Sequence, residues 1–267
     1  MTIFATGTTG TIGRHLASRV KSLDIDLATI VFQLEPSAIL DSDSLLHLAG
    51  IVGPAKVEEN LELSYQVNVS AVGRLGKQFI ESEGSKFVFV STSHVYEPSD
   101  DPILETHQIG PRNSYARQKR EAEVALLDIF SKEPERLCIV RVFSVLDWDV
   151  APFTLGGGIA KLIDANSKYV LNNCDDIRDF LTPRTIANAL VEICENSALS
   201  GEVNLCSGQG ITVGQAAREM LGSEAISEAL DRMNSGNSDN PLLVGDNSKL
   251  RSALPNLDLR WLPSIFT

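Results

Sequence analysis

Tyr115 and Lys119, in the segment NSYARQK, form the residue pair of this sequence that most directly suggests chemistry. Residues four apart share one face of a helix, so we expect the phenol and the ammonium to be neighbours. An ammonium beside a phenol stabilises the phenolate and lowers the tyrosine pKa from about 10 towards neutrality. Such a tyrosine can exchange a proton with a substrate hydroxyl while a hydride moves to or from a nicotinamide. Thr92, in VSTSHVY, has a hydroxyl that could hold the same substrate oxygen.

An isolated Tyr–Lys pair at this spacing is usually an exposed pair on a solvated helix face, so its interpretation depends on its surroundings. A glycine-rich turn, GTTGTIG with Gly7, Gly10 and Gly13, lies between an apolar run and a helical pattern at the start of the chain. Glycines at such positions permit a tight turn, approach of the backbone to a pyrophosphate and close helix–strand packing. The start of the expected helix would add N–H donors for the phosphates. A P-loop is excluded because no Gly-Lys-Ser/Thr follows.

The sequence leaves the choice between NAD and NADP open. An acidic residue that binds the ribose is expected about 20 residues beyond the last glycine, at the end of the second strand. Gln33 stands at that distance and Glu35 follows two residues later, while Arg14 lies near the glycine turn.

The elements that must position these residues alternate between strand and helix patterns. This alternation predicts an α/β protein with a parallel sheet covered by helices on both faces. Strand patterns occupy residues 2–6, 27–32, 45–48, 86–91 and 137–142, and helical patterns occupy 12–20, 67–80, 115–130, 211–221 and 223–233.

The pattern changes near residue 150, where FTLGGGIAKLI carries three consecutive glycines. We expect a dinucleotide-binding domain over 1–150, to which part of 170–210 returns, and a small interleaved substrate-binding lobe over 151–267.

Composition limits the classes of partner. Lys and Arg number 23 against 35 Asp and Glu, a formal charge of −12 that disfavours nucleic acid and anionic membrane surfaces. No apolar run is long enough to cross a bilayer, and the N-terminus lacks a charged signal-peptide start. The four cysteines show no CxxC or Cys/His spacing, so no metal site is expected. These features predict a soluble, cytoplasmic, metal-free protein.

The ordered motifs resemble the extended short-chain dehydrogenase/reductase family, of the NAD-dependent epimerase/dehydratase type that acts on nucleotide sugars. The similar segments are GTTGTIG, LLHLAG, NVSAVGRL, VSTSHVYEP, NSYARQK, RVFSVLD, IRDFLTPRTIANAL and GEVNLCSGQGITVGQAA. The resemblance implies a Rossmann-type doubly wound parallel sheet with a small C-terminal α/β lobe. It also implies a homodimer through the helices near 67–80 and 115–130.

The resemblance also implies roles for individual residues. Tyr115 would be the acid/base, Lys119 its partner and a ribose ligand, and Thr92 a ligand of the substrate oxygen. Arg178 would reach a nucleotide diphosphate, although an ion pair with Asp175, Asp176 or Asp179 is the alternative. The implied cofactor-binding residues are Gly7, Thr9, Gly10, Thr11, Ile12, Gly13, Leu48, Ala49, Gly50, Asn68, Tyr115 and Lys119; the implied substrate-binding residues are Ser93, His94, Asn113, Ser144 and Arg178.

Three departures from the family pattern bear on these expectations. The distance from the glycine turn to HLAG is short by about one βα unit, so the adenine side of the cofactor site should be trimmed. Ser144 stands where the family has Asn, and the Gly-Pro that follows in the family is absent. The C-terminal lobe ends early, which predicts an open nucleotide pocket or one completed by a partner chain.

Two reactions, and a third alternative without turnover, remain after this comparison. Dehydration is disfavoured because Ser93 and His94 stand where dehydratases carry an acidic pair. A 4-epimerase would oxidise and re-reduce a sugar carbon, whereas an NADPH-dependent reductase would reduce a keto-deoxy-sugar nucleotide once. The sequence favours the epimerase slightly. A non-catalytic cofactor sensor or scaffold of the same fold is the remaining alternative.

Overall fold

The central feature of the fold is a six-stranded, wholly parallel sheet. The computed structural model describes residues 1–16, 20–23, 25–26, 31–32, 39–40, 43–147, 155–162, 164, 167–239 and 241–260. The strand order is β10-β7-β6-β5-β1-β2. Their bounds are Ile3–Thr6 (β1), Val20–Ser22 (β2), Ser44–His47 (β5), Lys86–Thr92 (β6), Leu137–Val142 (β7) and Gly201–Leu205 (β10).

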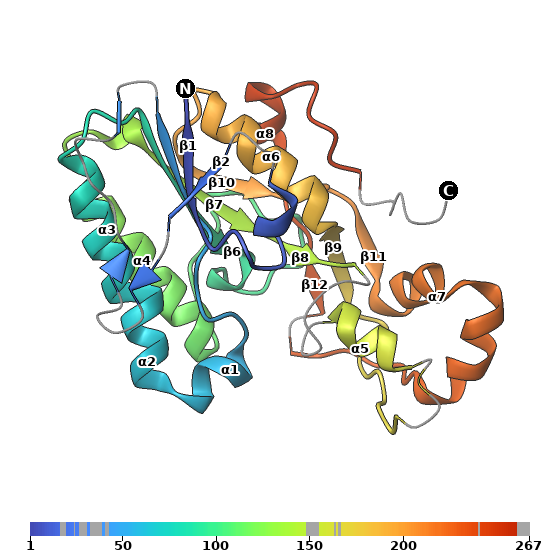
Figure 1. Ribbon diagram of the computed structural model, residues 1–267. Coiled ribbons are helices and arrows are strands. Elements are labelled where there is room, and N and C mark those ends of the chain that lie inside the picture. The colour runs from blue at the N-terminus through green and yellow to red at the C-terminus, as the bar shows by residue number, and fades with distance from the viewer. Residues whose placement is uncertain are drawn as a thin grey trace.

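Helices cover both faces of this sheet (Figure 1). One face carries α3 (Ala71–Ile80) and α4 (Ser114–Ile129), preceded by α1 (Pro54–Glu59), α2 (Leu61–Tyr65) and a π-helical turn over Gln66–Ser70. The other face carries α6 (Pro183–Glu195) and α8 (Ser248–Ala253).

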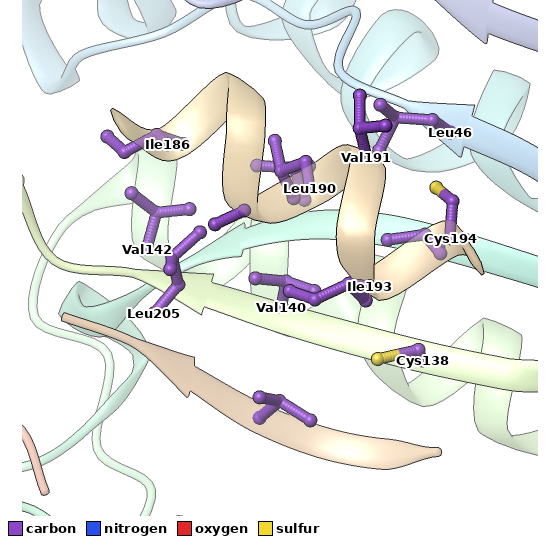
Figure 2. Packing of buried hydrophobic residues seen from close by; sticks show 14 of the residues in the cluster. Leu46, Cys138, Val140, Val142, Ile186, Leu190, Val191, Ile193, Cys194 and Leu205 are labelled. Atoms are coloured by element: carbon purple, nitrogen blue, oxygen red, sulfur yellow. The ribbon is translucent and has the colours of Figure 1, made fainter. Parts of the chain in front are cut away.

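Alternating side chains of the central strands build two separate apolar cores. Phe87 and Phe89 of β6 pack under α3 and α4, while Val88 between them faces α6. Figure 2 shows Leu190 and Ile193 of α6 packed over β7. Because both faces are covered, these strands are buried throughout, as is usual for parallel sheets.

A second, smaller lobe lies beyond the carboxyl edge of the main sheet. Its sheet contains β11 (Gly210–Thr212), β9 (Ile177–Leu181), β12 (Leu242–Leu243) and β8 (Ser144–Val145). Two helices pack with it, α5 (Leu155–Lys161) and α7 (Val213–Ala229), which is kinked at Gly222. Between these lobe elements the chain returns to the main sheet as α6 and β10.

The predicted fold class is confirmed: a parallel six-stranded sheet is flanked by helices. Among the described residues, the main sheet has two strands, β1 and β2, on the far side of β5 from β6, whereas a full dinucleotide-binding sheet has three strands on that side. The strands predicted at 2–6, 45–48, 86–91 and 137–142, and the helices predicted at 67–80 and 115–130, are present within one or two residues, the first turn of 67–80 being π-helical.

The prediction of a helix over residues 12–20 is wrong. The described part of this stretch contains a three-residue 3₁₀ helix, Gly13–His15, and Val20 already belongs to β2, paired with Ile3. The apolar spacing of Ile12, Leu16 and Val20 nevertheless reflects burial, since all three pack against the α6 core.

The described residues of the strand predicted at 27–32 do not join the main sheet. Its last two residues form β4 (Val31–Phe32), which pairs antiparallel with β3 (Ile25–Asp26), and residues 27–30 lie outside the described residues.

The helix predicted at 211–221 begins at Val213, after Thr212, whose hydroxyl accepts from the Gln215 amide. The helix predicted at 223–233 corresponds to the end of α7 and a 3₁₀ helix, Leu230–Arg232. Among the helices described here, none has the length and apolar character that a membrane span requires.

Candidate functional site

The carboxyl ends of β1, β5, β6 and β7 open onto a cavity of about 850 Å³. This is the edge at which open α/β sheets bind ligands, next to the point where the strand order reverses. The wall opposite the strand ends comes from the smaller lobe, through residues of α5, β9 and the segment before β9. The cavity therefore lies between the two lobes, and both contribute side chains to it.

The glycine turn lines the cavity and is fixed by its own packing. Gly7 has φ 71°, and a Cβ there would lie 2.6 Å from the Ala49 nitrogen, so this position requires glycine. A Cβ on Gly13 would collide with the Gly7 carbonyl oxygen. At Gly10 the nearest atom to an added Cβ is that same oxygen at 3.3 Å. Protein packing thus dictates Gly7 and Gly13, while Gly10 is exposed at the cavity, with its N–H donating to the Gly7 carbonyl.

The expectation that a helix following the glycine turn contributes to phosphate binding is wrong. The glycine turn leads into the Gly13–His15 3₁₀ helix, and three residues cannot build the aligned peptide dipoles of an α-helix. Phosphates at this turn would be held by individual backbone N–H groups without a helix dipole.

The adenine side of the site differs from the expectation as well. The strand beside β1 ends at Ser22, well before Gln33, because the first crossover is so short. Gln33 and Glu35 lie outside the described residues. At the strand end the Ser22 hydroxyl lies 2.9 Å from that of Thr8, and both residues line the cavity.

Leu48, Ala49 and Gly50 line the cavity at the end of β5. The loop that follows is held by Asn68, whose Oδ1 accepts from the Ile51 amide at 2.8 Å. The Asn68 side-chain nitrogen donates to the Ile51 carbonyl and to Gln118 of α4, both at 2.9 Å. Asn68 lies in the π-helical turn before α3, a distortion that often occurs at functional sites. Its amide thus fixes the cavity wall and α4 to each other.

Tyr115, Lys119 and Thr92 all line the same cavity. Tyr115 lies in the first turn of α4, which is capped by the Asn113 side chain accepting from the Ala116 amide at 2.8 Å. Lys119 is buried, with its Nζ 4.2 Å from the centre of the Phe89 ring. Thr92 ends β6, and its hydroxyl accepts from the His94 amide at 3.3 Å.

The electrostatics of this pair differ from the expectation. Burial lowers the pKa of Lys119 to about 7, against the opposing effect of the Glu123 carboxylate. Burial also raises the pKa of Tyr115 above its usual value, so the lowering expected from Lys119 does not occur. The physical reason is desolvation, which disfavours both the phenolate and the ammonium.

On the substrate side, His94, Ser144 and Arg178 line the cavity. Loss of hydration lowers the pKa of His94, and the positive charge of Arg178 adds to this. Ser93 and Asn113 are not among the lining residues: Ser93 is buried, and Asn113 is the cap of α4.

Arg178 makes the ion pair that the sequence offered as its alternative role. Its Nη2 lies 2.7 Å from an Asp176 carboxylate oxygen, and Nη1 donates to the carbonyls of Ile177 and Pro241. Asp179 has a different task, since it accepts from the Ser207 and Gly208 amides at 2.7 and 2.9 Å. Arg178 therefore faces the cavity with its positive charge already partly neutralised by the Asp176 carboxylate.

Besides Thr8, Ser22 and Ser91, sequence reasoning missed as lining residues the three polar residues Asn172, Asn173 and Asp176. They precede the IRDF segment, and Asn173 has φ 56°, a conformation that asparagine tolerates better than most residues. Their one sequence signal is the run of polar residues just before a strand. Among the described residues there is no cluster of His, Cys, Asp and Glu that could hold a metal ion.

Comparison with known proteins identifies relatives of this chain. UDP-glucose 4-epimerase from Rhizobium leguminosarum bv. trifolii is 28% identical over 267 aligned positions, covering 89% of this chain and 76% of that protein. RMD from Pseudomonas aeruginosa, solved in complex with NADPH, superposes with a TM-score of 0.76 at 20% identity, covering 97% and 93% of the two chains. UDP-glucuronic acid 4-epimerase from Bacillus cereus, in complex with UDP-glucuronic acid and NAD, gives 0.76 at 18%, covering 97% and 94%.

These structural similarities concern the fold, which they share with this chain over nearly its whole length. The family assignment comes from the sequence. The model of the NAD dependent epimerase/dehydratase family matches residues 3–206, from β1 to the residue after β10. The chain belongs to the NAD dependent epimerase/dehydratase family.

Proposed function

We propose that the protein is an NAD(P)-dependent oxidoreductase that acts on the sugar of a nucleotide sugar, in the manner of a 4-epimerase. One observation carries the proposal: a single cavity is lined by the glycine turn, by Tyr115 with Lys119 and Thr92, and by Arg178. Membership of the family supports the use of a nicotinamide dinucleotide. The similarity to UDP-glucose 4-epimerase supports a nucleotide sugar as substrate.

The residues present fit a dinucleotide. Gly10 is exposed at the cavity, where the Gly7 carbonyl oxygen at 3.3 Å is the one atom near an added Cβ. Gly7 to Gly13 would hold the pyrophosphate, and Lys119 would reach the ribose beside the nicotinamide. When bound, the dinucleotide supplies the acceptor or donor of a hydride.

The chain's own residues would handle the proton. The Tyr115 hydroxyl would exchange it with the sugar oxygen, and the Thr92 hydroxyl would hold that oxygen in place. A protonated Lys119 would stabilise the phenolate formed when Tyr115 gives up its proton. With its pKa raised, Tyr115 is held as the phenol, the form that carries the proton needed in the reductive direction.

A second candidate, an NADPH-dependent reductase of a nucleotide-linked 4-keto-deoxy sugar, is favoured by the short first crossover. Since the helix described behind the glycine turn is a three-residue 3₁₀ helix, the pyrophosphate would lack the attraction of an α-helix dipole. Weaker retention suits a cofactor that must leave after each turnover, whereas an epimerase regenerates its cofactor in place.

The test is to denature freshly purified protein and identify any released nucleotide by chromatography and mass spectrometry. Stoichiometric NAD would support the epimerase. An empty site that binds NADPH tightly would support the reductase. Binding of neither cofactor would contradict both reactions and leave the scaffold as the remaining interpretation.

Tyr115→Phe separates an enzyme from a cofactor-sensing protein. We expect turnover of UDP-sugars to fall by about 10²–10⁴-fold, because the variant lacks the proton-transferring hydroxyl. Cofactor affinity should stay near that of the parent protein. Parent protein that binds cofactor but turns over no nucleotide sugar would favour the sensor.

We further propose a homodimer formed through the helices near 67–80 and 115–130, which are α3 and α4. Large apolar side chains are exposed on α4, at Val124, and on the preceding helix α2, at Leu61 and Tyr65. Val124→Glu should lower the sedimentation coefficient from the value of a dimer to that of a monomer.

We also propose a cytoplasmic location, since all four cysteines are free thiols, as in a reducing compartment.

A further inference from the structure

Glu123 is a fully buried carboxylate on the same helix as Tyr115 and Lys119. It lies four residues after Lys119 in α4, which places it on the same helix face one turn further on. It does not line the cavity, so no substrate or cofactor contact explains it. A buried carboxylate is costly unless charged partners and hydrogen bonds compensate it.

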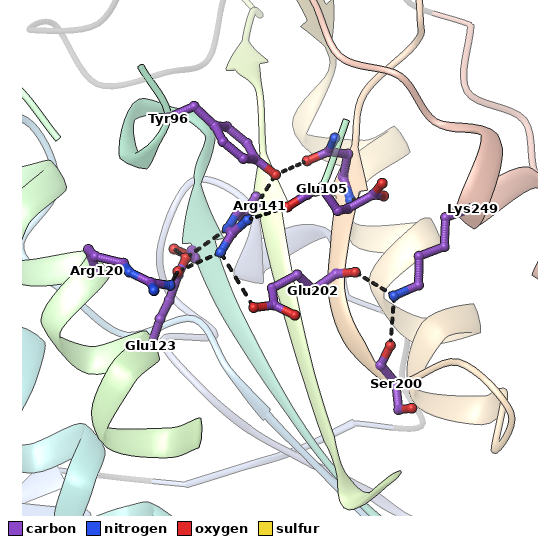
Figure 3. A network of polar contacts seen from close by, with 10 residues as sticks. Tyr96, Glu105, Arg120, Glu123, Arg141, Ser200, Glu202 and Lys249 are labelled. Atoms are coloured by element: carbon purple, nitrogen blue, oxygen red, sulfur yellow. Dashed lines mark hydrogen bonds and ion pairs between the residues drawn. The ribbon is translucent and has the colours of Figure 1, made fainter. Parts of the chain in front are cut away.

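The partners of Glu123 come from two strands of the sheet and from α4 itself (Figure 3). Arg141 of β7 donates from Nε at 3.2 Å and from Nη2 at 2.9 Å, an ion pair with two parallel bonds. The hydroxyl of Ser91, the residue before Thr92 in β6, also donates to it. Arg120 of α4 is partly exposed, and its Nη1 lies 2.9 Å from Oε2 of Glu123.

The network continues from Arg141 towards β10, the strand next to β7 at the edge of the sheet. Arg141 Nη1 donates to the Tyr96 hydroxyl at 3.0 Å, and that hydroxyl donates to Asn204 of β10 at 2.8 Å. Arg141 also lies 3.8 Å from Glu202. Through these contacts the position of α4 is fixed relative to three adjacent strands, β6, β7 and β10.

The charges that face Lys119 can be named element by element. His47 of β5 is held neutral because burial lowers its pKa to about 3, and Phe89 of β6 contributes a neutral ring. On α4, Tyr115 is a neutral phenol and Glu123 is the carboxylate that opposes the loss of the Lys119 proton. The charge of Lys119 therefore depends on Glu123 more than on its other neighbours.

We propose that Glu123 is the positioning residue of the Tyr115–Lys119 site: its carboxylate ties the helix that carries this pair to the strands that carry Ser91–Thr92 and Arg141, and it keeps Lys119 charged. The inference rests on the proposed function, because the charge of Lys119 matters for catalysis if Tyr115 transfers the proton. Glu123 acts through Lys119 and Thr92 and does not touch the substrate.

The direct test measures the protonation of Lys119 without turnover. Trace acetic anhydride modifies a deprotonated amine. Peptide mass spectrometry measures the extent of Lys119 acetylation at a series of pH values. The pH at which acetylation is half-maximal is the midpoint of Lys119 deprotonation. For Glu123→Gln, which keeps the size of the side chain, we expect the midpoint to fall by about one pH unit. The upper limb of the kcat profile against pH should move down by the same amount, with a small effect on KM.

Arg120→Gln is the matched control, since it removes another partner of the same carboxylate from the same helix. Its midpoint should stay within about 0.3 pH unit of the parent value, because the negative charge of Glu123 remains. A Glu123→Gln midpoint equal to that of the parent protein would overturn the proposal.

If Glu123→Gln does not fold, as judged by circular dichroism, Glu123→Gln with Arg141→Gln replaces both buried charges by a neutral pair. The same fall in the Lys119 midpoint is expected, and an unchanged midpoint again contradicts the proposal. Because acetylation requires no turnover, a missing epimerase or reductase activity would count against the proposed function and leave this result intact.

Discussion

The Thr6 hydroxyl and Nδ1 of His47 lie 2.8 Å apart, where β1 and β5 end side by side at the cavity. The same hydroxyl accepts from the Ala49 amide at 3.2 Å. One threonine thus joins the strand that leads into the glycine turn to the loop that forms the next part of the wall.

Thr6→Val should separate these two walls while preserving the shape of the side chain. Loss of the hydroxyl removes one hydrogen bond from the part-buried Ala49 amide and one from the His47 imidazole, which should cost about 1–3 kcal/mol in the free energy of unfolding. Urea denaturation measures this, and NAD(P) affinity should fall in parallel. Thr6→Ser keeps the hydroxyl and is expected to lose less than half as much stability.

His47 should make the protein sensitive to acid. Its pKa is lowered to about 3 by burial and secondarily by the positive charge of Lys119, whereas an unfolded histidine titrates near 6.5. As the pH falls from 6.5 towards 3, the unfolded state takes up a proton that the folded state does not. The free energy of unfolding should therefore fall by roughly 1 kcal/mol per pH unit from this group.

The comparison variant is His47→Asn, which offers Thr6 a polar partner but does not titrate. Urea denaturation between pH 4.5 and 7.5 should give a shallower dependence for the variant than for the parent protein. Parallel slopes would show that His47 is protonated in the folded protein within this range.

Alanine substitution should distinguish the glycines of the turn. Gly13→Ala forces a Cβ against the Gly7 carbonyl, and we expect a loss of about 3 kcal/mol or more in stability. At Gly10 an added Cβ would lie 3.3 Å from the Gly7 carbonyl oxygen, a tight contact that a small backbone shift can relieve, so Gly10→Ala should lose much less stability than Gly13→Ala. The methyl group of Gly10→Ala would occupy space in the cavity, and the NAD(P) affinity of this variant should fall at least tenfold. Unchanged affinity would argue against a pyrophosphate at Gly10.

Substitutions at the two residues of the Arg178–Asp176 ion pair should change KM for a nucleotide sugar in opposite directions. Arg178→Gln removes a charged donor, so KM for a nucleotide sugar should rise about 10–100-fold. Asp176→Asn removes the carboxylate that competes for the same guanidinium, so KM should fall. Arg218, exposed on α7 and not among the residues lining the cavity, provides the control Arg218→Gln, for which KM should not change. A rise in KM for both cavity variants would mean that the pair has a structural role alone.

The sequence predicted most of the framework because local pattern and tertiary burial agree there. The run KFVFVS is strongly β-forming, and as β6 it is buried on both faces. Lys119 and Glu123 follow Tyr115 at helical spacing, so α4 and the pairing of its side chains could be expected.

The first crossover shows where local pattern was insufficient. Ile12, Leu16 and Val20 are spaced as on one face of a helix, but the described residues of this stretch form a three-residue 3₁₀ helix, and Val20 already lies in β2. The pattern correctly indicated which residues are buried. The backbone conformation at Val20 depends on the pairing of Val20 with Ile3 in the sheet. Strand pairing over this distance is a tertiary choice that a local period does not reveal.

Residue types and spacing alone determined the candidate chemistry: a glycine turn, a Tyr–Lys pair and a threonine at a strand end. Tertiary structure decided that Asn172, Asn173 and Asp176 join them in one cavity, and that Arg178 is paired. It also decided the protonation of Lys119 and Tyr115, whose pKa values move in opposite directions through burial. Desolvation depends on every atom packed around a group, and those atoms come from parts of the chain far apart in sequence.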